Sequence, residues 1–440
     1  MIIPHPLTVL QKLKDKLNSN RRELVDSLYL MALQGINKLL PLFVLPYLLA
    51  VLGAEGYAYV GFSFALVQFA VLLVDFGFDL SATKHVALVK DDREALTRVF
   101  WSVVGAKTLL LLAAVPMVLL PVLLVPSYRP YLSATLCSLP MVIGSAFTFM
   151  WMYQGVGRVR HMVVITTLSK LLLRPLIFFF VCSAADSSLA AFLQTSVFML
   201  TAVVSCAWLW RLRLVGRPVF SWQDIRRETA DSLPLFLSRA STSVYTQLFV
   251  VILALFCTRE AVGRYTSAEA IMRAACFILY VPLTQAFFPR ISALSVSDRS
   301  RGLSTFRQLR TLIFWAMLLV AAAVAASAPI LPSLLGASYE GLTTLLLIMS
   351  SAPLFIGLGA VYGQMGLVAL GNMATRRLFR NAYFIVAPVS LLLLLPCALL
   401  WHENGAALAL VLTEALVFVL MYSACRRSQV LTDNPAAVCC

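Results

Sequence analysis

Long apolar runs alternate with short polar connections along the whole chain. A membrane-spanning helix needs roughly 20 apolar residues to cross a hydrocarbon layer about 30 Å thick. About twelve runs meet this requirement, and they lie at residues 24–51, 57–80, 99–125, 131–153, 162–183, 188–210, 234–257, 265–289, 309–331, 342–370, 382–401 and 405–424. The pattern therefore predicts an all-α integral membrane protein with about twelve transmembrane helices.

The longest polar connection, residues 211–233, divides the runs into two sets of six. We expect an N-lobe at residues 24–210, a cytoplasmic linker at 211–233, a C-lobe at 234–424 and a cytoplasmic tail at 425–440. Residues 1–23 place leucines at helical spacing beside Lys and Arg, which favours an amphipathic cytoplasmic helix on the anionic inner leaflet. A basic tail in solution is the alternative.

The two halves carry a faint repeat. Gly56-Tyr57 opens the second run, and Gly263-Arg264-Tyr265 opens the eighth in the same way. Duplicated bundles with the substrate site between them are a recurrent plan of transporters.

Composition and charge agree with a membrane protein. Hydrophobic residues make up 60% of the chain and charged residues only 12%, against about 25% charged residues in soluble domains. The formal charge of +15 comes largely from Lys and Arg on alternate connections, because the other connections hold only Arg129, Arg259 and Arg264. The positive-inside rule then puts both termini in the cytoplasm. The basic charge therefore reflects membrane topology and does not indicate a nucleic-acid partner.

Several classes of site are not indicated. The nine cysteines fall mostly inside apolar runs and form no CxxC pair or His-flanked cluster, so neither a disulfide framework nor a metal site is expected. The chain has no nucleophile–base set and no phosphate-binding Gly-rich loop, and we expect no cofactor. The short outer connections argue against an enzyme, including the membrane polymerases and ligases of surface glycans. Transport is the function class that remains.

Charged residues inside the apolar runs are the candidate site. A charge in mid-membrane costs roughly 2.5–3.5 kcal/mol on insertion scales, so it usually faces a partner or a watery cavity. Snorkelling to the interface is the alternative for Lys107 and Arg239, and an internal ion pair is the alternative for Glu269 with Arg273. The cations outnumber the acids, which suits an anionic head group such as a diphosphate. The predicted substrate-binding residues are Lys38, Lys107, Lys170, Arg174, Arg239 and Arg273.

Local stretches between residues 34 and 155 carry a family resemblance. They are Gln34-Gly35, Leu45-Pro46-Tyr47-Leu48, Leu52-Gly53-Ala54-Glu55-Gly56-Tyr57, Asp75-Phe76-Gly77-Phe78-Asp79-Leu80-Ser81-Ala82-Thr83-Lys84, Phe100-Trp101-Ser102 with Lys107, and Trp151-Met152-Tyr153-Gln154-Gly155. The chain resembles the Wzx O-antigen flippases of the multidrug/oligosaccharidyl-lipid/polysaccharide exporter superfamily in these stretches. It departs from them at Gly157, where the family commonly carries Glu.

The resemblance implies a V-shaped, two-lobed flippase of the bacterial inner membrane with a cationic central cavity. Its substrate would be an undecaprenyl-diphosphate-linked oligosaccharide moved from the cytoplasmic to the periplasmic leaflet. Membrane lipids, a polysaccharide polymerase and the chain-length machinery are the implied partners. The family also implies proton-coupled exchange, for which the titratable candidates are Asp75, Glu269 and Glu414.

Two alternatives stay open. A drug or organic-cation exporter of the same superfamily would need buried carboxylates facing the substrate, which the excess of buried cations disfavours. A non-transporting scaffold of a glycan-assembly complex would use all the buried charges as structural ion pairs.

Overall fold

The computed structural model describes the backbone of residues 6–432, and the side chains of these residues except 6–34, 36–39, 238, 241, 242, 244 and 245. Every regular element in this part of the chain is helical. The N-terminal half contains α1 (Pro6–Asp75), α2 (Phe78–Val89), α3 (Arg93–Leu124), η1 (Pro126–Tyr131), α4 (Leu132–Phe147), α5 (Met150–Gly155), α6 (Val159–Leu173), α7 (Leu176–Phe180), η2 (Ala184–Asp186) and α8 (Ser187–Arg211).

The C-terminal half is also helical, and a π-helix interrupts it once. It contains α9 (Trp222–Phe256), α10 (Arg259–Ser297), α11 (Arg299–Ser327), α12 (Leu331–Leu335), η3 (Ala337–Tyr339), α13 (Leu342–Met349), α14 (Ala352–Ala360), the π-helix η4 (Val361–Ala369) and α15 (Met373–Arg427). The prediction of an all-α membrane fold is confirmed.

Two very long helices are each divided by a kink where the sequence predicts a connection. Gly53 breaks α1 with a φ of 65°, a left-handed conformation that favours glycine. The kink in α15 lies at Trp401–His402. Among the described residues nine helices are long and apolar enough to cross a membrane, and both kinks fall inside members of this set, Leu40–Val89 and Met373–Arg427. The count of twelve spans and the cytoplasmic termini stay predictions.

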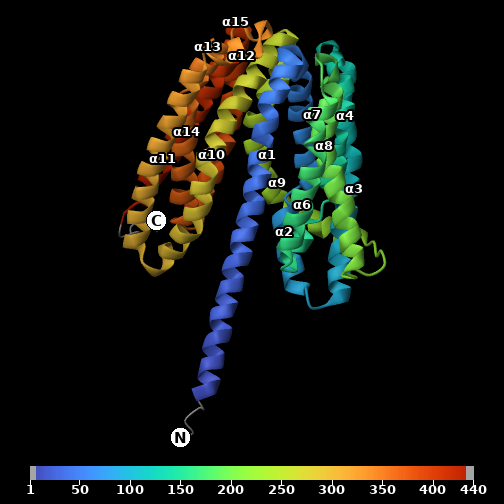
Figure 1. Cartoon of the computed structure of the whole chain (residues 1–440), viewed down its shortest axis with the longest axis vertical. Helices are drawn as coiled ribbons and strands as arrows, with labels where there is room; N and C mark the ends of the chain where they lie inside the picture. The colour runs from blue at the N-terminus through green and yellow to red at the C-terminus, as the bar shows by residue number, and fades with distance from the viewer. Residues whose placement is uncertain (1–5, 433–440) are drawn as a thin grey trace.

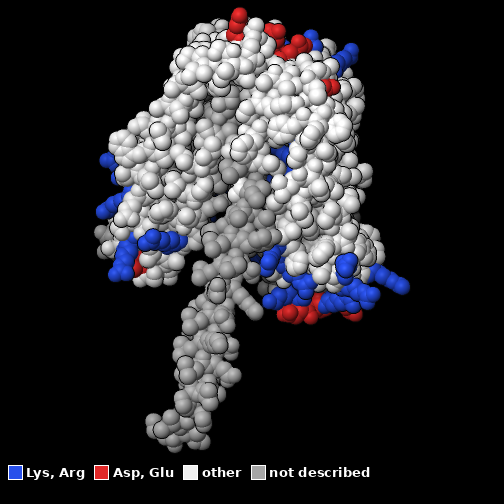
Figure 2. Space-filling model, viewed as in Figure 1, with Lys and Arg blue, Asp and Glu red and all other residues white. Residues whose placement is uncertain are grey.

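The helices form two lobes that meet at one end and diverge towards the other (Figure 1). Helices α2–α8 with part of α1 make one lobe, and α10–α15 make the other. Lys and Arg gather at the end where the lobes diverge, whereas Asp and Glu are visible at both ends (Figure 2). The positive-inside rule predicts that the diverging end faces the cytoplasm.

Helix α9 connects the lobes because it packs along α15 of the C-lobe and also contacts the N-lobe in both of its halves. Near its start, Phe236 stacks on Phe76 with ring centroids 4.4 Å apart. Gly77 makes room for this contact, since a Cβ there would lie 2.7 Å from the Cβ of Leu235. Near its end, the backbone carbonyl of Val251 accepts a hydrogen bond of 2.8 Å from the hydroxyl of Tyr128.

An ionic contact also fixes the start of α9 to the N-lobe. His85 Nδ1 on α2 lies 2.9 Å from Glu228 Oε2, and its Nε2 lies 3.8 Å from Asp231 Oδ2. Burial raises the pKa of Glu228, although the neighbouring His85 acts in the opposite direction. The first turns of α9 therefore form part of the basic end of the N-lobe.

Candidate functional site

In the C-lobe a guanidinium lies between two carboxylates. Arg273 Nε on α10 donates to Glu269 Oε1 at 2.8 Å, and Arg273 Nη1 lies 4.0 Å from Glu414 Oε1 on α15. The side chains of Arg273, Glu269 and Glu414 are 25%, 12% and 8% exposed. The internal ion pair between Glu269 and Arg273, one of the two interpretations of the sequence, is present. Glu414, from a helix far away in the sequence, lies beside it. We call these three residues the C-lobe triad.

In the N-lobe the end of α6 presents two predicted cations, Lys170 and Arg174. The helix stops there because Pro175 lacks a backbone N–H, and α7 begins at Leu176. Arg174 is half-buried, and its Nε is buried without a hydrogen-bond partner among the described residues. A guanidinium in this position retains donors for an anionic group.

The backbone brings Lys38 to the same depth as Lys170. The Tyr47 hydroxyl on α1 donates to the Val181 carbonyl at 2.8 Å, which joins the outer ends of two helices that run in the same direction. At about 1.5 Å per residue, Lys38 lies roughly 14 Å and Lys170 roughly 17 Å inward of this contact. The Lys38 side chain lies outside the described residues.

The C-lobe triad also lies inside the apolar band, but nearer the outer end than Lys38 and Lys170, because Ala54 follows Tyr47 by seven residues, or about 10 Å of helix. Helices α1 and α10 touch at the outer end, where a Cβ on Gly263 would come within 1.7 Å of the Ala54 carbonyl oxygen. Arg273 follows ten residues later on the same helix, which places it about 15 Å further inward. A small patch of Lys or Arg surface is visible inside the uncharged band in Figure 2. Both lobes therefore carry cations inside the apolar band.

The other predicted cations are paired with acids of the N-lobe. Lys107 Nζ lies 3.0 Å from Asp75 Oδ1 and also donates to the Ser145 carbonyl at 3.1 Å. Only 2% of the Lys107 side chain is exposed. Arg239 Nη1, midway along α9, lies 3.0 Å from Asp79 Oδ2 on α2. These pairs compensate the charges of Lys107, Arg239 and Asp75 within the protein, so they favour a structural role for these residues.

Replacing Lys107 with methionine is expected to lower the stability of the protein by about 3 kcal/mol, because Asp75 loses its partner inside the lobe. Thermal unfolding of the purified variant measures this loss. The double variant Lys107→Met with Asp75→Asn should recover most of the melting temperature. A double variant as unstable as the single one would contradict the structural role of the pair.

The outer end holds contacts that the sequence reading missed. The Tyr339 hydroxyl donates to the Leu49 carbonyl at 2.9 Å, and Arg259 Nε lies 3.2 Å from Glu55 Oε1. Together with the contact between Gly263 and Ala54, they join the lobes on the side away from the basic end, and we call them the outer seal. The repeated Gly-Tyr motifs are the sequence signal for the outer seal, since both lie next to the contact between Ala54 and Gly263.

Among the described residues, the charged side chains are not grouped as metal ligands. No group of three or more His, Cys, Asp or Glu that could hold a metal occurs among the residues the structure describes. Arginine and lysine bind anions, and a guanidinium matches the oxygens of a phosphate in a fork. The mid-depth cations therefore suit an anionic ligand.

Comparisons with known proteins agree with this picture. Residues 24–295 match the model of the family described as polysaccharide biosynthesis protein. A proposed O-antigen transporter of Escherichia coli strain K12 is 30% identical over 422 residues, which cover 94% of this chain and 100% of that protein. A second one, from Shigella dysenteriae, is 27% identical and covers 90% of this chain and 98% of that protein.

Two solved structures share the fold. One is an inward-facing MATE family multidrug resistance transporter of the MOP superfamily, with a TM-score of 0.69 and 15% identity over 89% of this chain and 94% of that one. The other is the lipid II flippase MurJ in an inward closed conformation, with a TM-score of 0.69 and 13% identity over 91% and 87% of the two chains. This protein belongs to the polysaccharide biosynthesis protein family.

Proposed function

We propose that this protein flips an undecaprenyl-diphosphate-linked oligosaccharide from the cytoplasmic to the periplasmic leaflet of the bacterial inner membrane. The names of its relatives, which are proposed O-antigen transporters, support a surface-polysaccharide repeat unit as the cargo. The observation that supports the proposal is that both lobes carry cations within their apolar spans, Arg174 in the N-lobe and Arg273 in the C-lobe.

In this proposal the two arginines hold the diphosphate and the lysines add attraction. Arg174 and Arg273 would engage phosphate oxygens in forks, while Lys170 and Lys38 would act as point charges. Lobes that meet at the outer seal and diverge at the basic end support a state that receives cargo from the cytoplasm. Release on the other side would require the outer seal to open, and the polymerase and chain-length machinery would then take over the product.

The same arrangement suggests a coupling site. In the C-lobe triad two carboxylates face one guanidinium, so the triad carries one carboxylate in excess. A proton taken up by Glu269 or Glu414 would neutralise that excess, and an arriving diphosphate would compete for Arg273. Asp75 is a weaker candidate because Lys107 already holds it.

A drug or organic-cation exporter fits less well. Such a protein needs carboxylates that are free to face a cationic substrate, whereas Asp75 and Asp79 in the N-lobe are paired with Lys107 and Arg239. Resistance to cationic dyes on expression would favour this alternative. An Arg174 variant that no longer moves cargo but still supports glycan assembly would favour the alternative of a non-transporting scaffold.

Complementation in a bacterium that lacks its own O-unit flippase tests the proposal. Wild type should restore the surface polysaccharide, and Arg174→Gln and Lys170→Gln should reduce it at least about tenfold because each removes a phosphate-binding charge. Arg301→Gln is the matched control, since this side chain is 80% exposed at the cytoplasmic end. Full activity of both mid-depth variants would refute the binding site, and no activity of wild type with its matching glycan would refute the flippase.

A further inference from the structure

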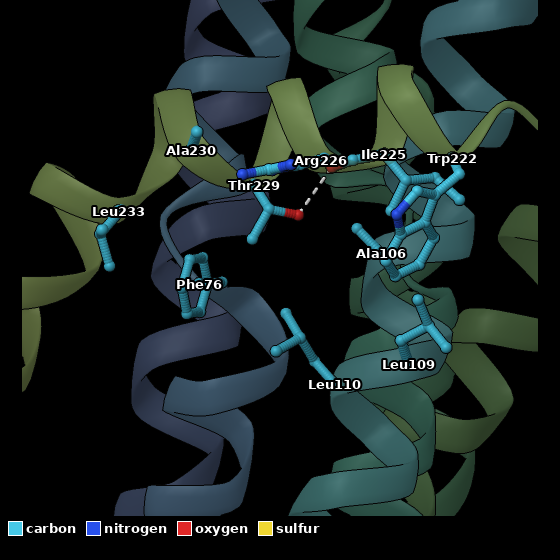
Figure 3. Close-up of a pocket in the computed structure, with 10 residues that line it drawn as sticks. All are labelled: Phe76, Ala106, Leu109, Leu110, Trp222, Ile225, Arg226, Thr229, Ala230 and Leu233. Carbon is cyan, nitrogen blue, oxygen red and sulfur yellow. Dashed lines mark hydrogen bonds between the residues drawn. The ribbon is translucent and has the colours of Figure 1, made fainter.

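A pocket of about 360 Å³ lies beneath the first turns of α9, outside the mid-depth charged site. Three parts of the chain line it: Phe76 from the turn between α1 and α2, Leu109 and Leu110 from α3, and residues between Trp222 and Leu233 from α9. In Figure 3 the turns of α9 lie across one side of the pocket, with Phe76 and Leu110 on the other. Helices α10–α15 contribute no lining residue, so the pocket belongs to the N-lobe and its junction with α9.

The walls of the pocket are apolar almost throughout. The hydroxyl of Thr229 donates to the Ile225 carbonyl at 2.8 Å, so its proton is already used (Figure 3). Arg226 is the charged residue of the lining. Its side chain is exposed, extends along this wall towards Thr229 in Figure 3, and has no ion-pair partner among the described residues. The pocket thus combines a hydrocarbon-like interior with one available cation.

The position of the pocket relative to the membrane favours a lipid as its ligand. Arg226 belongs to the basic connection on the cytoplasmic side, whereas Leu109 and Leu110 belong to the third apolar run. Leu109 and Leu233 on the rim are each 44% exposed, so the opening faces the acyl region of the inner leaflet. At about 30 Å³ for a group of water size, the pocket holds roughly a dozen methylene-sized groups.

We propose that this pocket binds one acyl chain of an anionic phospholipid of the cytoplasmic leaflet, with the lipid phosphate on Arg226. Basic pockets between transmembrane helices on the cytoplasmic side are suited to anionic head groups. The bound chain would touch the turn at Phe76, α3 and α9 together and would fix the start of α9 to the N-lobe. Because α9 connects the lobes, the lipid would stabilise this junction independently of the cargo.

Lipid binding to the purified full-length protein tests the proposal. Native mass spectrometry would compare phosphatidylglycerol with phosphatidylcholine of the same chain length, and phosphatidylglycerol should be retained about fivefold more strongly. Leu110→Trp fills the pocket and Arg226→Ala removes its cation, so each should abolish this preference. The matched controls are Leu112→Trp, on the same helix but 67% exposed and outside the lining, and Arg227→Ala, the neighbouring arginine.

Two results would overturn the proposal. One is an equal preference for phosphatidylglycerol in wild type and in both pocket variants. The other is that Leu110→Trp reduces the retention of a polyprenyl phosphate but leaves the retention of phosphatidylglycerol unchanged. That result would make the pocket part of the path of the cargo. Arg226 is exposed, so Arg226→Ala remains informative if Leu110→Trp fails to fold.

Discussion

Replacing Gly263 with alanine is expected to reduce transport at least tenfold while the protein still inserts into the membrane. A Cβ at this position would lie 1.7 Å from the Ala54 carbonyl oxygen, which is backbone and cannot rotate away. Helices α1 and α10 would have to separate by more than about 1 Å to reach ordinary contact. Overpacking of this kind costs about 1–3 kcal/mol. The cost falls on the state in which the outer seal is closed, so the equilibrium shifts towards opening on that side.

Surface polysaccharide in the complemented strain measures the loss, and a cysteine reporter measures its cause. Ser338 accepts a hydrogen bond from the Ala54 backbone N–H at 3.4 Å, so Ser338→Cys should react faster with a membrane-impermeant maleimide when Gly263→Ala is present. Gly359→Ala is the matched control, because its Cβ meets ordinary contacts from 3.5 Å outwards. Unchanged transport and labelling in Gly263→Ala would contradict the outer seal.

Replacing Arg273 with methionine is expected to abolish transport and to destabilise the protein. The change leaves Glu269 and Glu414 facing each other at mid-depth, and removal of one partner of a buried ion pair costs about 3–5 kcal/mol. Thermal unfolding and complementation measure the two effects separately. The double variant Arg273→Met with Glu269→Gln removes one charge of each sign, so it should recover part of the stability, while Glu414 stays without a cation.

The double variant distinguishes a working site from a structural one. If Arg273 holds the diphosphate, transport should stay at least tenfold below wild type even after part of the stability returns. Full transport by the double variant would instead make the C-lobe triad a structural ion pair, as the scaffold alternative requires.

The helices and their breaks could be predicted because the signals are local. Apolar runs of span length gave the membrane helices, and the polar residues around Gly53 and His402 gave the two breaks that the kinks confirm. The start of α9 was missed, since residues 222–233 lack a continuous apolar run. They are helical because Ser221 caps the helix, accepting a hydrogen bond from the Asp224 N–H, and because one face packs on the N-lobe.

The site could be predicted only as a set of charged positions. The cost of a charge in lipid indicated Arg174 and Arg273, but the sequence held no information on which charges would find distant partners. Lys107 meets Asp75 across 32 positions of chain, and the Tyr339–Leu49 bond of the outer seal spans 290. Such contacts depend on how the lobes pack, which no local pattern encodes.

Flipping by the purified protein in proteoliposomes tests the central claim most directly. The cargo would be a fluorescent oligosaccharide on undecaprenyl diphosphate, with leaflet position read from its accessibility to an enzyme outside the vesicle. We expect wild type to move the cargo between leaflets and Arg174→Gln to move it at least about tenfold more slowly at equal insertion. No movement by wild type with its own glycan, or equal rates in wild type and Arg174→Gln, would contradict a flippase that holds the diphosphate on mid-depth cations.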